Sequence, residues 1–143
     1  MDLRSYDCGT SSYPLLGVTI GEMLNSIAAR VPDTEAVVSV HQNIRWTYRD
    51  LLAQVNSIAR GLMALGVEKG DRVGIWAMNY AEWIVVQFAT AKIGAIMVNI
   101  NPAYRTYELE YVLKQAEIQT LIIQGRFKTS DYVGMFYEAC PES

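Results

Sequence analysis

The sequence is poor in the residues that build metal centres and nucleophile–base pairs. Its 143 residues include two cysteines and one histidine. Cys8 and Cys140 lie near opposite ends and form no cluster at zinc-ligand spacing, so we expect no metal site. His41 is the only base available to a serine–histidine–acid triad, and no Gly-x-Ser-x-Gly segment accompanies it. We therefore expect His41 to be a solvated turn residue.

Phosphate-binding loops and an excess of positive charge are also missing. No G-x-G-x-x-G or Walker pattern occurs, which disfavours nicotinamide dehydrogenases and P-loop enzymes. Gly66, Gly70 and Gly74 flank a turn before a predicted strand, whereas a phosphate loop follows a strand, so we interpret them as cap and turn residues. The net charge is −3, and the 12 lysines and arginines are scattered. This distribution argues against a nucleic-acid partner.

Uninterrupted hydrophobic runs of membrane-spanning length are absent as well. Residues 83–100 carry one charge, Lys92, but Gly94 splits the run and Asn99 interrupts it. A spanning helix needs about 20 continuous apolar residues, so we expect no transmembrane segment. Residues 1–17 contain two acids and no long apolar core, unlike a secretory signal or transit peptide. This favours the cytoplasm; a mitochondrial location is the alternative if a transit peptide has been lost.

The N-terminal part carries clear signals for the start and end of a helix. We expect residues 1–18 to form an irregular arm and residues 19–143 to form a partial domain. Thr19 and Glu22 have the spacing of a capping box, in which two side chains satisfy the first free amides of a helix. Pro32 then ends that helix.

A hairpin and a second helix are predicted next. Residues 36–40 and 44–46 have strand composition around a short turn. Thr47 is a helix cap with Asp50 at the third position, and Gly66 is placed to end the helix. An apolar stripe at helical spacing predicts the buried face. The polar residues predicted to lie on the other side of this helix are Arg49, Gln54, Asn56 and Arg60.

The remainder of the chain alternates strands with helices. The expected strands are 72–78, 95–100 and 119–123, and the expected helices are 80–93, 106–117 and 131–139. Such alternation predicts an α/β fold of three layers, in which a mostly parallel sheet is flanked by helices. The strands are apolar on both faces, so we expect both faces to be covered. One sheet edge is expected to be open, which would permit self-association or partner binding.

Several segments resemble one known family, the adenylate-forming acyl-CoA synthetases of the AMP-binding superfamily. The similar segments include 66–75 (GVEKGDRVGI), 79–83 (NYAEW) and 91–113 (AKIGAIMVNINPAYRTYELEYVL). Residues 46–51 are similar to the family's first core motif, with Asp50 in place of the usual Glu. The chain most resembles medium-chain fatty acyl-CoA synthetases, on the segments 101–104 (NPAY), 108–113 (ELEYVL) and 127–129 (FKT).

The family's reactive motifs do not occur in these 143 residues. By resemblance, a full-length enzyme would join a fatty acid to ATP with magnesium, release pyrophosphate, and pass the acyl group to coenzyme A. The motifs for this are a Ser/Thr/Gly-rich phosphate loop ending in Pro-Lys-Gly, a Tyr-x-x-Thr-Glu segment, a ribose-binding Asp and a C-terminal lysine. We therefore expect an incomplete N-terminal subdomain that is inactive alone. We assign it no catalytic, cofactor-binding or metal-binding residue.

Two alternatives remain open. In the first, the chain is a truncated, non-catalytic interaction module that pairs with a full-length synthetase through its open sheet edge. In the second, it is a small flavodoxin-like binding domain. A following Thr-Ser-Gly-Thr-Thr-Gly-like loop in the reading frame would favour truncation of an enzyme. Tight binding of flavin or nucleotide would favour the flavodoxin-like domain.

Some polar and aromatic residues are also candidates for a site. The loop 99–105 follows the carboxyl end of a predicted parallel strand, where open α/β sheets bind ligands, although the resemblance implies a scaffold role. Ser11 and Ser12 are expected to lie in an exposed arm. The residues that we assign to the helix surface are Glu108, Glu110 and Glu117. Those that we assign to the core, with an acyl-pocket lining as the alternative, are Trp76, Trp83, Phe88, Tyr104, Tyr107 and Tyr111.

Overall fold

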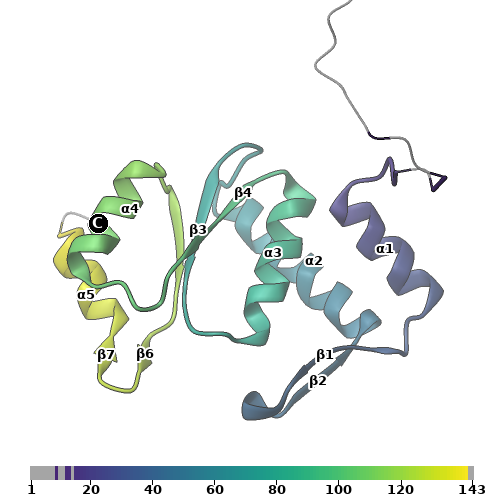
Figure 1. Ribbon diagram of the computed structural model, residues 1–143, viewed down its shortest axis with the longest axis horizontal. Coiled ribbons are helices and arrows are strands. Elements are labelled where there is room, and N and C mark those ends of the chain that lie inside the picture. Colours follow the sequence, from purple (N-terminus) through teal and green to yellow (C-terminus); the bar gives the residue numbers. More distant parts are fainter. Residues whose placement is uncertain (1–8, 10–11, 14, 142–143) are drawn as a thin grey trace, which may run out of the picture.

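The computed structural model describes residues 9, 12, 13 and 15–141. A parallel sheet lies in the middle, with α4 and α5 on one side and α3 and α2 on the other, so three layers are formed (Figure 1). The helices are α1 (Ile20–Arg30), α2 (Tyr48–Ala64), α3 (Ala81–Ile93), α4 (Thr106–Gln115) and α5 (Tyr132–Ala139). The strands are β1 (Glu35–Ser39), β2 (Ile44–Thr47), β3 (Arg72–Trp76), β4 (Ile96–Ile100), β5 (Thr120–Ile123), β6 (Arg126–Phe127) and β7 (Ser130–Asp131).

The central sheet has the order β4-β3-β5, and both pairings are parallel. The predicted fold class is therefore confirmed. Strand β3 is buried on both faces, because Val73 faces the α2–α3 layer and Trp76 faces the α4–α5 layer. The expectation that both faces of every strand are covered is wrong for β4, since Ile96 is 51% exposed. As an edge strand, β4 has a sheet neighbour on one side only.

The predicted helix caps are confirmed. Thr19 and Glu22 form a capping box at α1, and Thr47 and Asp50 form one at α2. Gly66 ends α2 in the left-handed region at φ +90°, while the Val67 and Gly66 amides donate to carbonyls of the last turn. Gly94 does the same for α3, at φ +77°. These stops set the points at which the chain turns into β3 and β4.

The predicted hairpin is present, with β1 and β2 antiparallel and Asn43 in the left-handed conformation between them. A short 3₁₀ turn, η1 (Val40–Gln42), forms its tip. The arm predicted over residues 1–18 lies largely outside the described residues, as do Cys8 and Ser11. The described residues include no helix long and apolar enough to cross a membrane.

Lys92 ties the first three helices together. Its ammonium donates to the amide oxygens of Asn25 in α1, at 2.8 Å, and Asn56 in α2, at 2.6 Å. Partial burial lowers the pKa of Lys92. Asn56, predicted to lie on the polar side of α2, is half-buried beside Lys92. Gly21 allows α1 to approach, since a Cβ there would lie 2.9 Å from the Lys92 Cγ.

The α4 helix differs most from its prediction. It ends at Gln115, two residues early, because Glu117 adopts a left-handed conformation at φ 47°. The apolar face was expected to include Tyr107, but Tyr107 is 81% exposed. Leu109 is fully buried instead, beside Trp76 and Tyr132. The helix thus packs on the sheet through aliphatic residues and turns two tyrosines, Tyr107 and Tyr111, outward.

Candidate ligand pocket at the carboxyl ends of β3 and β5

A pocket of about 290 Å³ lies where β3 and β5 end side by side. The connection after β3 leads to α3 on one face of the sheet, and α4, before β5, lies on the other face (Figure 1). Open α/β sheets bind ligands at such a switch point. The residues lining this pocket are Ile75, Ala77, Tyr80, Glu82, Trp83, Ile122, Ile123 and Gln124.

Gln124 joins the two loops that border the pocket. Its side-chain oxygen accepts the Met78 amide at 2.9 Å. Its side-chain nitrogen donates to the Tyr80 hydroxyl at 3.2 Å and to the Arg126 carbonyl at 3.1 Å. Nearby, the Trp83 indole donates to the Met78 carbonyl at 2.8 Å. These polar groups hold the pocket walls, so the open surface offered to a ligand is mainly apolar and aromatic.

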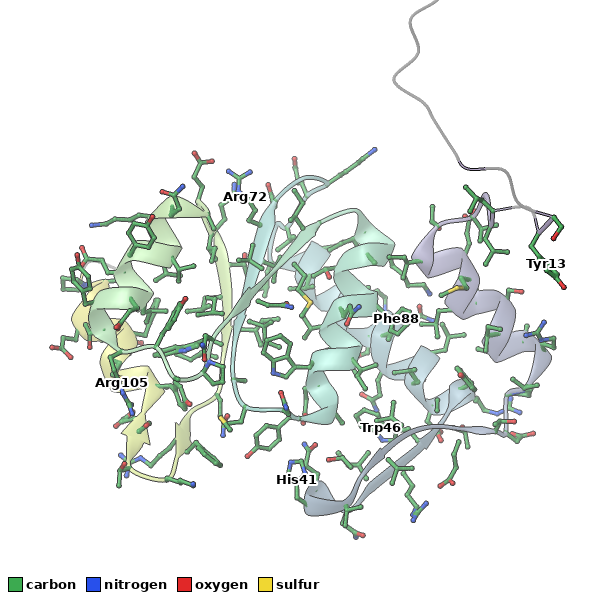
Figure 2. All side chains as sticks on the ribbon, viewed as in Figure 1. Tyr13, His41, Trp46, Arg72, Phe88 and Arg105 are labelled. Atoms are coloured by element: carbon green, nitrogen blue, oxygen red, sulfur yellow. The ribbon has the colours of Figure 1, made fainter. Side chains whose placement is uncertain are left out.

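The hairpin tip supplies the missing cap of α3. Tyr80, at the N-cap position, makes no side-chain capping bond, but Gln42 accepts the Ala81 amide at 2.8 Å. The Gln42 amide also donates to Glu82 at 2.8 Å. His41 lies exposed at this tip, with its ring edge-on to Tyr80 at 5.2 Å, and Figure 2 shows it pointing toward the start of α3. The prediction of an exposed turn position for His41 is confirmed.

The loop 99–105, for which we considered a ligand contact, is held in place by two hydrogen bonds from side chains. The Trp76 indole donates to the Asn101 carbonyl at 3.1 Å, and the Tyr132 hydroxyl donates to the Pro102 carbonyl at 3.0 Å. The first bond attaches the loop to the end of β3, and the second attaches it to the start of α5. The loop lines none of the pocket at β3 and β5, because β4 lies on the other side of β3.

A second pocket, of about 420 Å³, continues from the first between α2 and α3. The two share Glu82 and Ile122, so we name them together the α2–α3 groove. Leu65, which lines the second pocket, is 78% exposed and Ile58 is 38% exposed. The groove runs beside β5, which has a partner strand on one side only. Apolar surface therefore lies next to an unpaired strand edge.

The predicted acidic and aromatic candidates do not gather in this groove. The exposed Glu108 carboxylate accepts the Arg105 amide at 3.1 Å, Glu110 pairs with Lys114, and Glu117 pairs with Arg72 at the start of β3. In the described part of the chain, no three His, Cys, Asp or Glu side chains come together as a metal site. The groups whose pKa values are shifted are Glu22, Asp50, Lys92, Lys114 and Asp131, and they lie outside the groove.

The pocket residues were missed from the sequence because strand order decides which loops are neighbours. Trp76 and Trp83 were both assigned to the core, with a pocket lining as the alternative. Trp76 is fully buried, whereas Trp83 is half-buried in the pocket wall. Tyr107 and Tyr111 were assigned there wrongly, since both are exposed. A signal for the site was present in the sequence, because polar residues directly follow two predicted strands. These residues include Tyr80, after the strand 72–78, and Gln124, after the strand 119–123.

Comparison with known proteins identifies the family. The family described as "AMP-binding enzyme" matches residues 24–139. The chain belongs to this family. It is 44% identical over 138 residues to the mitochondrial medium-chain acyl-CoA ligase ACSF2 of Macaca fascicularis. It is also 44% identical, over 128 residues, to the putative acyl-CoA synthetase YngI of Bacillus subtilis (strain 168). These matches cover 96% and 90% of this chain but only 22% and 23% of the relatives.

Solved structures of AMP-binding enzymes share the fold. The N-terminal domain of FACL13 from Mycobacterium tuberculosis has a TM-score of 0.71 at 33% identity, over 73% of this chain and 26% of that domain. A putative long-chain-fatty-acid CoA ligase from Rhodopseudomonas palustris has a TM-score of 0.77 at 31% identity, over 87% of this chain and 30% of that chain. The chain therefore corresponds to an N-terminal part of acyl-CoA synthetases, as its motifs indicated.

Proposed function

We propose that this chain is the N-terminal scaffold of a fatty acyl-CoA synthetase. The complete enzyme would condense a fatty acid with ATP, release pyrophosphate, and transfer the acyl group to coenzyme A, as a ligase of fatty acid metabolism. The observation that carries this proposal is the family match over residues 24–139, joined to identities above 40% with acyl-CoA ligases. Residues 19–143 would form part of a larger domain, preceded by an arm.

The described pocket does not fit ATP with magnesium. A triphosphate needs convergent backbone amides or basic side chains, and magnesium needs carboxylate oxygens. The lining of the first pocket contains no lysine, no arginine and no glycine, and its one carboxylate, Glu82, is bonded to Gln42. Its volume of about 290 Å³ falls just below the roughly 300–1,000 Å³ typical of sites for drug-sized ligands. We therefore derive no reaction step from this pocket.

The contribution of the chain to the enzyme is architectural. Hydrogen bonds to Gln124 and Gln42 fix the loop between β3 and α3 at the carboxyl end of the sheet. The α2–α3 groove offers apolar surface beside β5. The matched FACL13 domain is about four times as long as the part that this chain covers, because the match spans 26% of it. We infer that further residues of such a domain cover the groove and pair with β5.

An assay of the purified chain tests the proposal. With fatty acid, ATP, magnesium and coenzyme A supplied, we expect neither acyl-adenylate nor acyl-CoA, because the reactive motifs are absent from the sequence. Formation of either product would contradict the scaffold role. Tight binding of flavin mononucleotide in the same preparation would favour the flavodoxin-like alternative instead.

The alternative of a non-catalytic module predicts a stable complex with a full-length synthetase. Mixing the chain with a purified synthetase and measuring the complex by sedimentation separates the two readings. A scaffold segment has no site on an already complete enzyme, so we expect no complex. The cellular location stays a proposal: the ACSF2 relatives are named mitochondrial, and the alternative is the cytoplasm. Imaging of a tagged full-length protein distinguishes the two compartments.

A further inference from the structure

The outer face of α4 carries an aromatic pocket that the scaffold role does not use. Its volume is about 170 Å³. Its lining, which we name the α4 tyrosine pocket, consists of Tyr104, Tyr107, Glu108, Tyr111 and Val112. Tyr107 is 81% exposed and Tyr111 is 64% exposed. Neither ring therefore contributes to the core that Leu109 forms on the opposite face of the helix.

The chemistry of this lining favours a cation. The face of a tyrosine ring carries negative charge density, which attracts ammonium groups. Glu108 adds a carboxylate, and the lining contains no lysine or arginine. The two basic side chains closest in sequence are engaged elsewhere, since Lys114 pairs with Glu110 at 2.5 Å and Arg105 donates to Ser130 at 2.7 Å. Figure 2 shows Arg105 beside the C-terminal hairpin and α5.

The size of the pocket narrows the ligand further. A volume of about 170 Å³ lies well below the roughly 300–1,000 Å³ of sites that hold drug-sized molecules. A nucleotide or coenzyme A would therefore not fit, whereas a small head group would. Aromatic linings recognise methylated ammonium groups in particular. We propose that the α4 tyrosine pocket binds a trimethylammonium head group.

This site lies on a different face of the sheet from the α2–α3 groove. Helix α4 lies on the face of the sheet opposite to α2 and α3 (Figure 1). A segment that covers the α2–α3 groove would therefore leave the α4 tyrosine pocket open. The proposal goes beyond the synthetase role, and it stands whether or not the chain supports adenylation.

A titration with choline tests the proposal. The matched control ligand is 3,3-dimethylbutan-1-ol, which has the same shape without the charge. We expect saturable shifts of tyrosine ring proton signals with choline, and at least about tenfold weaker binding of the neutral alcohol. Equal binding of both ligands, or none of choline, would overturn the proposal. Binding of a proline-rich peptide in place of choline would also overturn it, since aromatic grooves bind such peptides through shape.

Variants separate the cation site from a general aromatic surface. Tyr107→Leu should weaken choline binding by roughly two- to thirtyfold, whereas Tyr107→Phe should retain it because the ring face is kept. Glu108→Gln should weaken binding while preserving an acceptor for the Arg105 amide. Tyr137→Leu, on α5, is the control, because Tyr137 is 57% exposed but lies outside the pocket lining. A loss with Tyr137→Leu equal to that with Tyr107→Leu would contradict the assignment.

Two sources of the head group can be distinguished. Phosphatidylcholine vesicles and phosphatidylglycerol vesicles present the same membrane with and without the trimethylammonium group. If the chain sediments with phosphatidylcholine vesicles but not with phosphatidylglycerol vesicles, and Tyr107→Leu abolishes this sedimentation, the source is a lipid. Binding of free choline without vesicle sedimentation would identify a soluble source. Equal sedimentation with both vesicles, insensitive to Tyr107→Leu, together with no choline binding would contradict the site itself.

Discussion

Single residues decide where the helices stop and how closely they approach. Gly66 and Gly94 adopt positive φ values that a side chain disfavours. Lys92 donates to amide oxygens on two other helices, and its stem occupies the space beside Gly21. The sequence predicts the glycine stops, because their conformation is a local requirement. It does not predict the Lys92 contacts, because these depend on residues 36 and 67 positions away.

The stop at Gly66 gives a prediction with a matched control. Gly66→Ala should lower the free energy of unfolding by about 1 kcal/mol, because φ is +90° and nothing within 4 Å compensates. Gly61→Ala, within α2 and also free of neighbours within 4 Å, should raise it by about 0.5–1 kcal/mol. Urea unfolding of both variants provides the measurement. Equal effects of the same sign would show that Gly66 is not acting through its backbone conformation.

Elements are defined by caps and by faces, and these differ in how well a sequence predicts them. Capping boxes at α1 and α2 connect residues three apart, so Thr19 with Glu22 and Thr47 with Asp50 are visible in the sequence. The α4 face was predicted less well. Leu109 is three and four residues from Val112 and Leu113, so helical spacing places it on their buried face, whereas Tyr107 lies off that face and is exposed.

The α2 cap predicts a pH dependence. Hydrogen bonds from the Thr47 side chain and then its backbone lower the pKa of Asp50 below its usual 3.8. The folded state thus favours the carboxylate, and this contribution is present above the unfolded pKa and is lost as pH falls through the folded value. The stability difference between the unchanged chain and Asp50→Asn should therefore narrow as pH drops below about 4.

Urea unfolding between pH 6 and pH 2.5 measures this difference. The control is the same Asp50→Asn comparison in a Thr47→Ala background, where the largest of the interactions that lower the pKa is missing. In the Thr47→Ala background, the stability difference caused by Asp50→Asn should narrow less as the pH falls. A difference that stays constant with pH in the Thr47 background would mean that the capping bond does not favour the carboxylate.

At the scale of the whole molecule, the main feature is apolar surface beside an unpaired strand. The alternation of strands and helices predicts the parallel sheet, but it does not predict the order β4-β3-β5. That order places the ends of β3 and β5 together, and it explains why the loop 99–105 was considered and the residues Tyr80 and Gln124 were missed. The β6–β7 hairpin was also not predicted, since its strands have two residues each.

The open groove predicts self-association of the isolated chain. Leu65→Asp should weaken it, because a charge would be placed on a groove residue that is 78% exposed. Met63→Asp, at a residue that is 53% exposed and outside the groove lining, is the control and should change it little. Sedimentation velocity over a range of concentrations measures the effect. Equal weakening by both variants would place the contact elsewhere.

The most direct test of the scaffold claim is a chimera in which this chain replaces the matching segment of the Bacillus subtilis relative YngI, with which it is 44% identical over 128 residues. Acyl-CoA formation from fatty acid, ATP and coenzyme A is then compared between the chimera, YngI and the isolated chain. We predict that the chimera and YngI form acyl-CoA while the isolated chain does not. A folded chimera without activity beside an active YngI, or product formed by the isolated chain, would contradict the account.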